Sequence, residues 1–390
     1  MNYESYKSIV LSSIFGIIHS VAFVSSVFSA IINQNISDPL MIASILAIKR
    51  FSRIFLDIPA GIVGDKFGSK ILFILSMLSI LLSMSVLLLS KTIVVLFISV
   101  ALKGLSDSCS AGKVEAHIYN ILTHDNNFDK FGKIISTYYL FMDLAVGFVV
   151  FLLSIYLFNV DQFLLYGIIL SVCGLAMSIF IQDSYIINNT KRPTFKEIFN
   201  GIKTIYQSKS MFLLILLWGL CNFLGWQLHS ITTILLAHFN FTINQIVRVQ
   251  SMEHFALVVG CIISFIVSDK ISFKKIMYLF LFSVITMCIC AILYTPFMII
   301  ASILLYLCCF CTIQVFFEKI IDKLSTGQSR LSINSATTTI AAIYNSIGMV
   351  LFGFLAKYYG YKISWNIICF LFLLYIIVIY FFIKYKKLTF

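Results

Sequence analysis

The sequence predicts an all-helical membrane protein, with about twelve transmembrane helices in two six-helix bundles related by a pseudo-two-fold axis. Composition is the first indication, because 60% of the 390 residues are hydrophobic and only 11% are charged. A soluble domain carries roughly 25% charged residues, since its exposed faces contact water. Most of this protein's surface must therefore face lipid, which excludes an ordinary soluble protein.

The lengths of the apolar stretches are the second indication. A helix needs about 20 residues to cross roughly 30 Å of hydrocarbon. We expect spans at residues 8–32, 40–63, 70–90, 92–121, 132–157, 162–182, 210–237, 243–268, 274–294, 296–317, 331–356 and 362–384. The first stretch is too long for the core of a signal peptide, so we expect it to be retained.

The distribution of basic residues predicts the orientation. A net charge of +12 would suit a nucleic-acid partner, but the basic residues gather in the loops on the side of the N-terminus. Only Lys91, Lys357 and Lys362 fall in loops on the opposite side. This bias follows the positive-inside rule. We therefore expect cytoplasmic termini, no nucleic-acid partner, and a multi-pass protein of the cell (inner or plasma) membrane, in a bacterium given the compact loops.

The longest hydrophilic stretch, residues 183–209, separates an N-terminal bundle (1–182) from a C-terminal bundle (210–390). Apolar residues recur within it at helical spacing, which predicts an amphipathic helix on the cytoplasmic membrane face. The loops at 65–70 and 269–274 share the pattern Asp-Lys-x-x-x-Lys at equivalent topological positions. This repeat favours two halves of common descent.

Four segments resemble a known family. Residues 61–70 (GIVGDKFGSK) resemble the loop signature of the major facilitator superfamily, G-x-x-x-D-[RK]-x-G-x-[RK]. Residues 57–61 (DIPAG) resemble the E-x-P-x-G of its drug-exporter-like branches, with Asp in place of Glu. Residues 112–119 (GKVEAHIY) are similar to the G-x-x-E-A-x-x-Y that ends their span four, and residues 330–335 (RLSINS) to the start of their span eleven.

The resemblance implies a monomeric secondary transporter that works by alternating access, embedded in the lipid bilayer and without a cofactor. It assigns a gating loop and its contacts to Asp57, Gly61, Gly64, Asp65, Lys66, Gly68, Lys70, Glu115 and Arg330. Glycines let helices and loop approach closely. Residues 142–148 lack the span-five motif of the antiporter branches, and Val100 replaces their span-four arginine. Both departures weaken the transfer of a proton-antiport mechanism.

Charged residues inside the spans form the candidate substrate site. A charge in the bilayer costs a few kcal/mol and usually faces a cavity or a partner. At middle depth we count more cations than acids: Lys49, Arg50, Arg53, Lys103 and Arg248 against Asp107, Asp143 and Glu253. This surplus predicts a substrate with a carboxylate or phosphate, clamped partly by Arg50 or Arg53. The alternative is purely structural pairing, including an Arg53–Asp57 pair and pairs between the other cations and acids on neighbouring helices.

Three buried acids are candidates for proton coupling, because burial and neighbouring charge change the protonation of a carboxyl group. They are Asp107, Asp143 and Glu253, with His254 as a further candidate. We expect His19 and His229 to serve helix packing.

Span seven is expected to supply the other wall of the cavity. Its aromatic and polar residues are Trp218, Asn222, Trp226, Gln227 and His229, and Gly219 and Gly225 could loosen the helix. Of these, Asn222, Trp226 and Gln227 are the candidate substrate-binding residues. Such a wall suits an amphiphilic substrate, and simple aromatic packing is the alternative.

We expect the protein to export a small amphiphilic or anionic compound, such as a drug, an antibiotic, a peptide-like toxin or a metabolite. The export is a candidate for proton coupling. Uptake of a small anionic solute is the alternative. The chain lacks P-loop, H-E-x-x-H and G-x-S-x-G motifs, which argues against an enzyme, and its two halves argue against a channel. The ten cysteines lie in spans without a C-x-x-C pair, so we expect no metal and no disulfide.

Overall fold

The computed structural model describes residues 3–22, 28–29, 31–32, 36–127, 130–156, 160–181, 203, 209–267, 273–324 and 330–385. Every regular element within these ranges is a helix. Eleven helical segments within these ranges are long and apolar enough to cross a membrane, with Ile93–His124 counted as one segment. Helix α3 (Pro39–Phe67) has 29 residues, about 44 Å at 1.5 Å per residue, but carries several charges. The predicted helical membrane fold is confirmed.

The helices follow one another in two groups. The first comprises α1 (Tyr3–Ala22), α3, α4 (Ser69–Leu89), α5 (Ile93–Ser110), α6 (Lys113–His124), α7 (Phe131–Ile155) and α8 (Val160–Phe180). The second comprises α11 (Lys209–His238), α12 (Ile243–Val267), α13 (Phe273–Leu293), α14 (Pro296–Leu324), α15 (Arg330–Tyr359) and α16 (Tyr361–Tyr385). We call these groups the N-half and the C-half.

One predicted span differs from the structure. The expected helix at 92–121 is divided into α5 and α6, because Gly112 adopts a left-handed backbone with φ of 72°. Glycine reaches this conformation without the steric cost that a Cβ atom imposes. The break places Ser110, Gly112 and Glu115 beside the central cavity described below.

Gly68 forms the sharp turn expected of the gating loop. Its φ is 98°, and its N–H donates to the Gly64 carbonyl oxygen over 2.9 Å, so that α3 ends and α4 begins within one residue. The side chains of Asp65 and Arg330 lie outside the described set, as do the repeat residues 269 and 270. The amphipathic helix predicted within 183–209 also lies outside the described residues, apart from positions 203 and 209.

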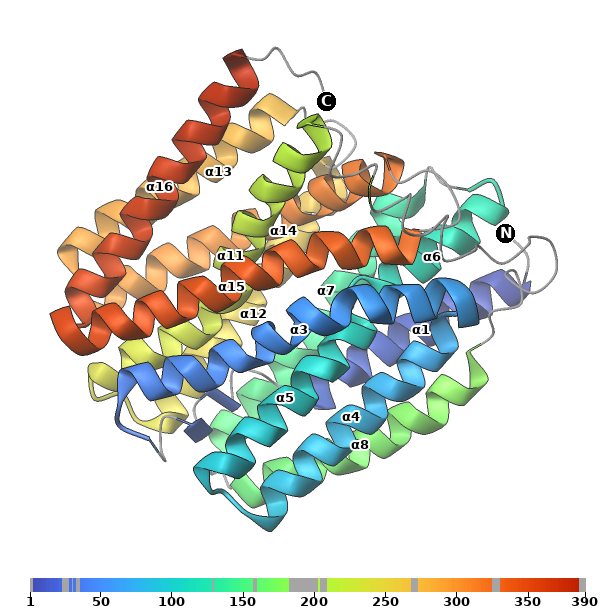
Figure 1. Ribbon diagram of the computed structural model, residues 1–390, viewed down its shortest axis with the longest axis horizontal. Coiled ribbons are helices and arrows are strands. Elements are labelled where there is room, and N and C mark those ends of the chain that lie inside the picture. Colours follow the sequence, from blue (N-terminus) through green and yellow to red (C-terminus); the bar gives the residue numbers. More distant parts are fainter. Residues whose placement is uncertain are drawn as a thin grey trace.

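The two halves meet along two pairs of helices. The most extensive packing between elements joins α3 to α15, and the next joins α7 to α12. Figure 1 shows α3 and α15 side by side along the bundle. They run antiparallel, because Asp38 at the start of α3 accepts a 2.7 Å hydrogen bond from Lys357 near the end of α15. Through this bond Lys357 holds the pKa of the Asp38 carboxyl below its ordinary value.

Gly353 allows α15 to approach the start of α3 closely. A Cβ atom at this position would lie 2.3 Å from the Ala43 Cβ and 3.0 Å from the Pro39 carbonyl oxygen. Real atoms do not approach that closely, so a side chain here would force the two halves apart.

We expect Gly353→Val to destabilise the purified protein by about 1–3 kcal/mol through overpacking, and so to lower its apparent Tm. The control is Phe354→Leu at the next position, where the side chain is largely exposed on the bundle surface. Equal apparent Tm values for the two variants in a thermal unfolding assay would contradict the close approach.

Candidate substrate site

A cavity of about 260 Å³ lies between the two halves. Its lining includes charged side chains of α3 and α5 on the N-half, and aromatic and amide side chains of α11 on the C-half. All seven substrate-binding candidates from the sequence line it: Lys49, Arg50, Arg53, Lys103, Asn222, Trp226 and Gln227. The structure therefore brings together residues that are more than 170 positions apart in the chain.

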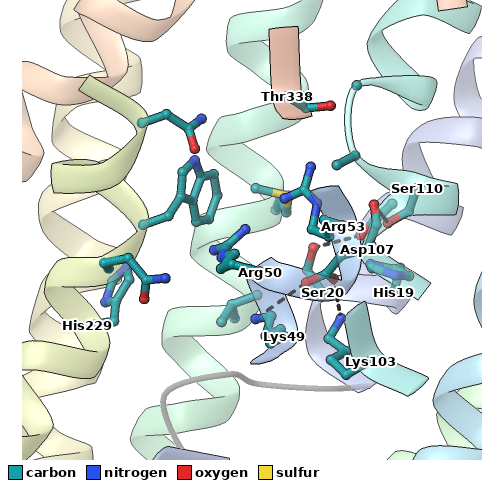
Figure 2. A pocket seen from close by; sticks show the side chains of 18 of the residues that line it. His19, Ser20, Lys49, Arg50, Arg53, Lys103, Asp107, Ser110, His229 and Thr338 are labelled. Atoms are coloured by element: carbon teal, nitrogen blue, oxygen red, sulfur yellow. Dashed lines mark hydrogen bonds and ion pairs between the residues drawn. The ribbon is translucent and has the colours of Figure 1, made fainter. Parts of the chain in front are cut away.

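Asp107 is the centre of the charged wall. Its Oδ1 accepts a 2.7 Å hydrogen bond from the Lys103 ammonium, one turn earlier on α5. Its Oδ2 lies 3.4 Å from the Lys49 ammonium on α3. Figure 2 shows Lys49 and Lys103 joined to this one carboxylate. Asp107 thus links α3 to α5 and offsets charge on both helices.

The Arg53–Asp57 pair is present as predicted. The Arg53 Nε and Nη2 atoms donate to the two Asp57 carboxylate oxygens at 3.3 and 3.1 Å. Both side chains are buried, with 6% and 1% of their surface exposed. This bidentate geometry is the strong form of a guanidinium–carboxylate contact, and it fixes Arg53 along the axis of α3.

Arg50 differs from its neighbours. It is 7% exposed and lines the cavity, yet no carboxylate among the described side chains lies within 4.0 Å of its guanidinium. The charged wall of α3 and α5 holds four cations, at 49, 50, 53 and 103, against two carboxylates, at 57 and 107. The excess of positive charge is local to this wall, because Glu115 and Asp143 line other parts of the cavity.

Arg248 does not belong to this group. It was predicted at middle depth, but it lies in the second turn of α12 and its side chain is exposed. Helix α12 begins at residue 243, as predicted for this span, so the error lies in the depth assigned to Arg248 and not in the start of the helix. Asp143 and Glu253 also lie outside the charged wall, although Asp143 lines the same cavity.

The C-half wall is built on α11. Trp226 meets Phe310 edge to face, with ring centroids 6.3 Å apart, and Trp218 stacks on the same ring at 6.5 Å. Gly225 lets the Phe310 ring approach, because a Cβ atom there would lie 2.2 Å from its edge. Helix α11 is continuous, so its glycines serve packing and do not interrupt the helix. The amides at 222 and 227 add hydrogen-bonding groups beside the rings.

Two histidine–carboxylate pairs lie in the same region. Asp143 Oδ1 on α7 is 3.1 Å from His254 Nδ1 on α12, and Glu253 Oε2 is 2.5 Å from His229 Nδ1 on α11. Asp143 was a possible partner of the cations under the structural-pairing alternative, but its described contact is with His254. His229, expected to serve helix packing, links α11 to α12 through Glu253. The partners come from different helices, so no spacing along the sequence could reveal them. His19 is buried, and its Nε2 lies 2.9 Å from the Ser106 hydroxyl.

One cluster has the ligand types of a metal site. The ligand atoms of Asp143, Cys261 and Cys311 all lie within 4.8 Å of one another. The two sulphurs are 3.5 Å apart and share a hydrogen bond, while His254 engages the carboxylate. A carboxylate and two thiols could hold a zinc-like ion. Because the three residues come from α7, α12 and α14, no sequence motif identifies them.

The gating candidates are partly described. Glu115 accepts a 2.8 Å hydrogen bond from the Tyr139 hydroxyl, which ties α6 to α7. The Lys66 ammonium lies 5.5 Å from the centre of the Phe67 ring. The two contacts place Glu115 and Lys66 against neighbouring aromatic side chains. The role of these residues in gating stays a prediction.

Comparison with known proteins decides the family. The model of the Major Facilitator Superfamily matches residues 10–344, which is most of the chain. The chain belongs to the Major Facilitator Superfamily. Its family and fold are those of transporters, not enzymes, and a small-molecule substrate and a lipid bilayer follow from them.

Solved structures place this major facilitator among similar folds. A single-site variant of the nucleoside transporter NupG has a TM-score of 0.73 and 13% identity, covering 96% of this chain and 99% of its own. Another NupG structure has a TM-score of 0.67 and 14% identity, covering 97% and 99%. At such identities the likeness shows the fold alone. A search of curated proteins finds no match, and the drug-exporter branch inferred from the sequence is not confirmed.

We expect Asp107→Asn to destabilise this major facilitator by about 3–5 kcal/mol, because the buried Lys103 ammonium and the partly buried Lys49 ammonium lose their shared carboxylate. Fluorescence-detected size-exclusion chromatography after heating would show a lower apparent Tm. Lys103→Gln in the same protein should restore part of the loss. The exposed Lys91–Asp161 pair supplies the control, since Asp161→Asn should change stability by less than about 1 kcal/mol. Equal losses from the two aspartate changes would contradict a structural role for Asp107.

Proposed function

We propose that this protein is a secondary transporter that takes up a small organic anion containing a planar, hydrogen-bonding ring. The single observation that carries the proposal is Arg50, a buried guanidinium that lines the cavity without an ion pair among the described side chains. Burying an unpaired charge is costly, and a carboxylate or phosphate on the substrate would remove that cost. Because a guanidinium can bind such a group through two parallel hydrogen bonds, Arg50 is the anion-binding residue.

The opposite wall supports the ring. Trp226 offers an aromatic surface, and Asn222 and Gln227 offer both donors and acceptors beside it. A planar heterocycle can stack on the indole and satisfy the amides at its edge. The amides set the ring's orientation, while Arg50 holds the anionic group from the N-half.

A substrate held in this way bridges the halves. Arg50 belongs to α3 and Trp226 to α11, so full binding requires both walls at the right separation. A ligand shifts a conformational equilibrium only through contacts that differ between the two states. Simultaneous contact with both walls supplies that difference and couples binding to alternating access.

The direction of uptake rests on the comparisons. The two similar structures are nucleoside transporters by name, and a nucleoside is a metabolite that a cell uses rather than a toxin that it expels. A nucleoside also contains a planar, hydrogen-bonding ring, in agreement with the C-half wall. These points favour uptake over the drug export expected from the sequence.

The proposal is tested with three labelled probes in cells that express the protein and in matched cells without it. Orotate combines a planar ring with a carboxylate, uridine has the ring without the charge, and succinate has the charge without the ring. We expect uptake of orotate above that of both other probes. Uptake of uridine alone would reject the anionic requirement, and faster loss of preloaded orotate from expressing cells would indicate export.

For the binding residue itself, we expect Arg50→Gln to weaken orotate uptake about 10- to 150-fold in apparent KM, the value of one charge-assisted hydrogen-bonded contact of about 1.5–3 kcal/mol. Arg50→Lys should recover part of the affinity, since an ammonium keeps the charge but loses the bidentate geometry.

The matched control is Arg248→Gln, which removes an exposed arginine of α12. Expression and apparent Tm are measured for every variant. An Arg50→Gln protein that folds normally and takes up orotate like the Arg248→Gln control would reject Arg50 as the anion site.

A further inference from the structure

We propose that Asp143, Cys261 and Cys311 form a binding site for a zinc-class divalent ion, which ties the N-half to the C-half when it binds. The carboxylate belongs to α7, and the two thiols belong to α12 and α14. The inference goes beyond the proposed function, because it does not depend on which solute the protein carries. It also departs from the absence of metal expected from the sequence, which rested on the spacing of cysteines along the chain.

The three ligand atoms are close to a coordination geometry. They all lie within 4.8 Å of one another, and the Cys261 and Cys311 sulphurs are 3.5 Å apart. A tetrahedral zinc ion with Zn–S bonds of about 2.3 Å places two sulphurs about 3.8 Å apart. The two thiols therefore need to separate only slightly to accept the ion.

Close helix packing holds these ligands in place. A Cβ atom on Gly260 of α12 would lie 2.5 Å from the Cys308 carbonyl oxygen and 3.1 Å from the Cys311 Cβ, so this glycine lets α14 approach α12. On the other side, the Ser251 hydroxyl of α12 donates to the Gly147 carbonyl oxygen of α7 over 2.9 Å. Ligands on packed helices are held in position before an ion arrives, so binding requires little rearrangement.

The surroundings of the ligands suit a cation. Among the described side chains, no lysine or arginine lies within 4.0 Å of the Asp143 carboxylate, whose contact is His254 Nδ1 at 3.1 Å. Such an outer partner orients a carboxylate that binds a metal. The Cys311 thiol donates to the Leu257 carbonyl oxygen over 3.3 Å. That oxygen lies within α12 and accepts the helix's own hydrogen bond, so it keeps a partner when the thiol binds an ion.

The ligand types select the class of ion. Thiolates favour zinc and related soft ions, whereas magnesium and calcium favour oxygen ligands. Asp143 lines the central cavity, so an ion arriving from water meets this carboxylate first and then the two buried thiols. Each thiol releases one proton to water as its bond to the ion forms. Three protein ligands leave the fourth tetrahedral position to a water molecule from the cavity.

An ion at this site spans the interface between the halves. Asp143 lies on the N-half, whereas Cys261 and Cys311 lie on the C-half. Movement of α7 away from α12 and α14 must then break a metal–ligand bond. A ligand favours the conformation in which it makes the better contacts. Binding of the ion therefore stabilises the packed arrangement of these helices and slows alternating access.

The first test titrates Co²⁺ into the purified full-length protein, stripped of metal and with its thiols reduced. Cobalt is the probe because it occupies zinc sites and its thiolate complexes absorb light. We expect a thiolate-to-cobalt charge-transfer band that saturates at a single ion per chain and disappears when excess Zn²⁺ is added. The double variant Cys261→Ser/Cys311→Ser should lose the band.

The matched control is Cys309→Ser, which removes a neighbouring thiol of α14 and should keep the band. No band in wild type would overturn the proposal. A band of equal intensity in the double variant would also overturn it, because the ion would then bind other thiols.

The second test examines the link between the halves by hydrogen–deuterium exchange with and without Zn²⁺. In wild type we expect zinc to slow exchange in α7, α12 and α14. Asp143→Asn keeps both thiols and the shape of the side chain, but an amide is a poor zinc ligand. At a zinc concentration that saturates this variant, the slowing in α7 should be lost while that in α12 and α14 remains.

Asp161→Asn, which changes an exposed acid of α8, should behave like wild type. Slowing of α7 by zinc in Asp143→Asn would reject the link between the halves. Asp143→Ser carries the same expectation if Asp143→Asn does not fold. Neither test uses a transported solute, so both remain decisive if orotate proves not to be carried.

Discussion

The structure depends on keeping four cations inside a helical bundle that is surrounded by lipid. Two carboxylates make this possible: Asp57 holds Arg53 in a bidentate pair, and Asp107 holds Lys49 and Lys103 between α3 and α5. These contacts place every cation of the wall except Arg50 in a fixed position. The charge of Arg50 is then not offset by a carboxylate in contact with it among the described side chains, and it lines the cavity.

Much of the helical fold and part of the charged wall could be predicted from the sequence, because the relevant signals are local. Apolar stretches of about 20 residues mark the spans, and the spacing of Arg53 and Asp57 puts them on one helical face. The break at Gly112 was not predicted, since an isolated glycine within an apolar stretch is equally compatible with a continuous helix. The depth of Arg248 was misjudged although the start of its helix at residue 243 was predicted correctly, because only about one helical turn separates the two positions.

The contacts between helices could not be predicted in the same way. His254 meets Asp143 across 111 positions, and His229 meets Glu253 across 24. Such pairs follow from how α7, α11 and α12 pack, which depends on side-chain shapes along the whole of each helix. The sequence therefore identified Asp143, Glu253 and His254 as candidates without identifying their partners, and it assigned His229 to helix packing alone.

The placement of the cations on α3 has a further consequence. This helix carries three of the four cations of the charged wall and also forms the most extensive contact with the opposite half, through α15. Side chains that face the cavity and the largest packing surface between the halves therefore share one backbone. A substitution at position 49, 50 or 53 that shifts this backbone is expected to disturb the packing against α15 as well.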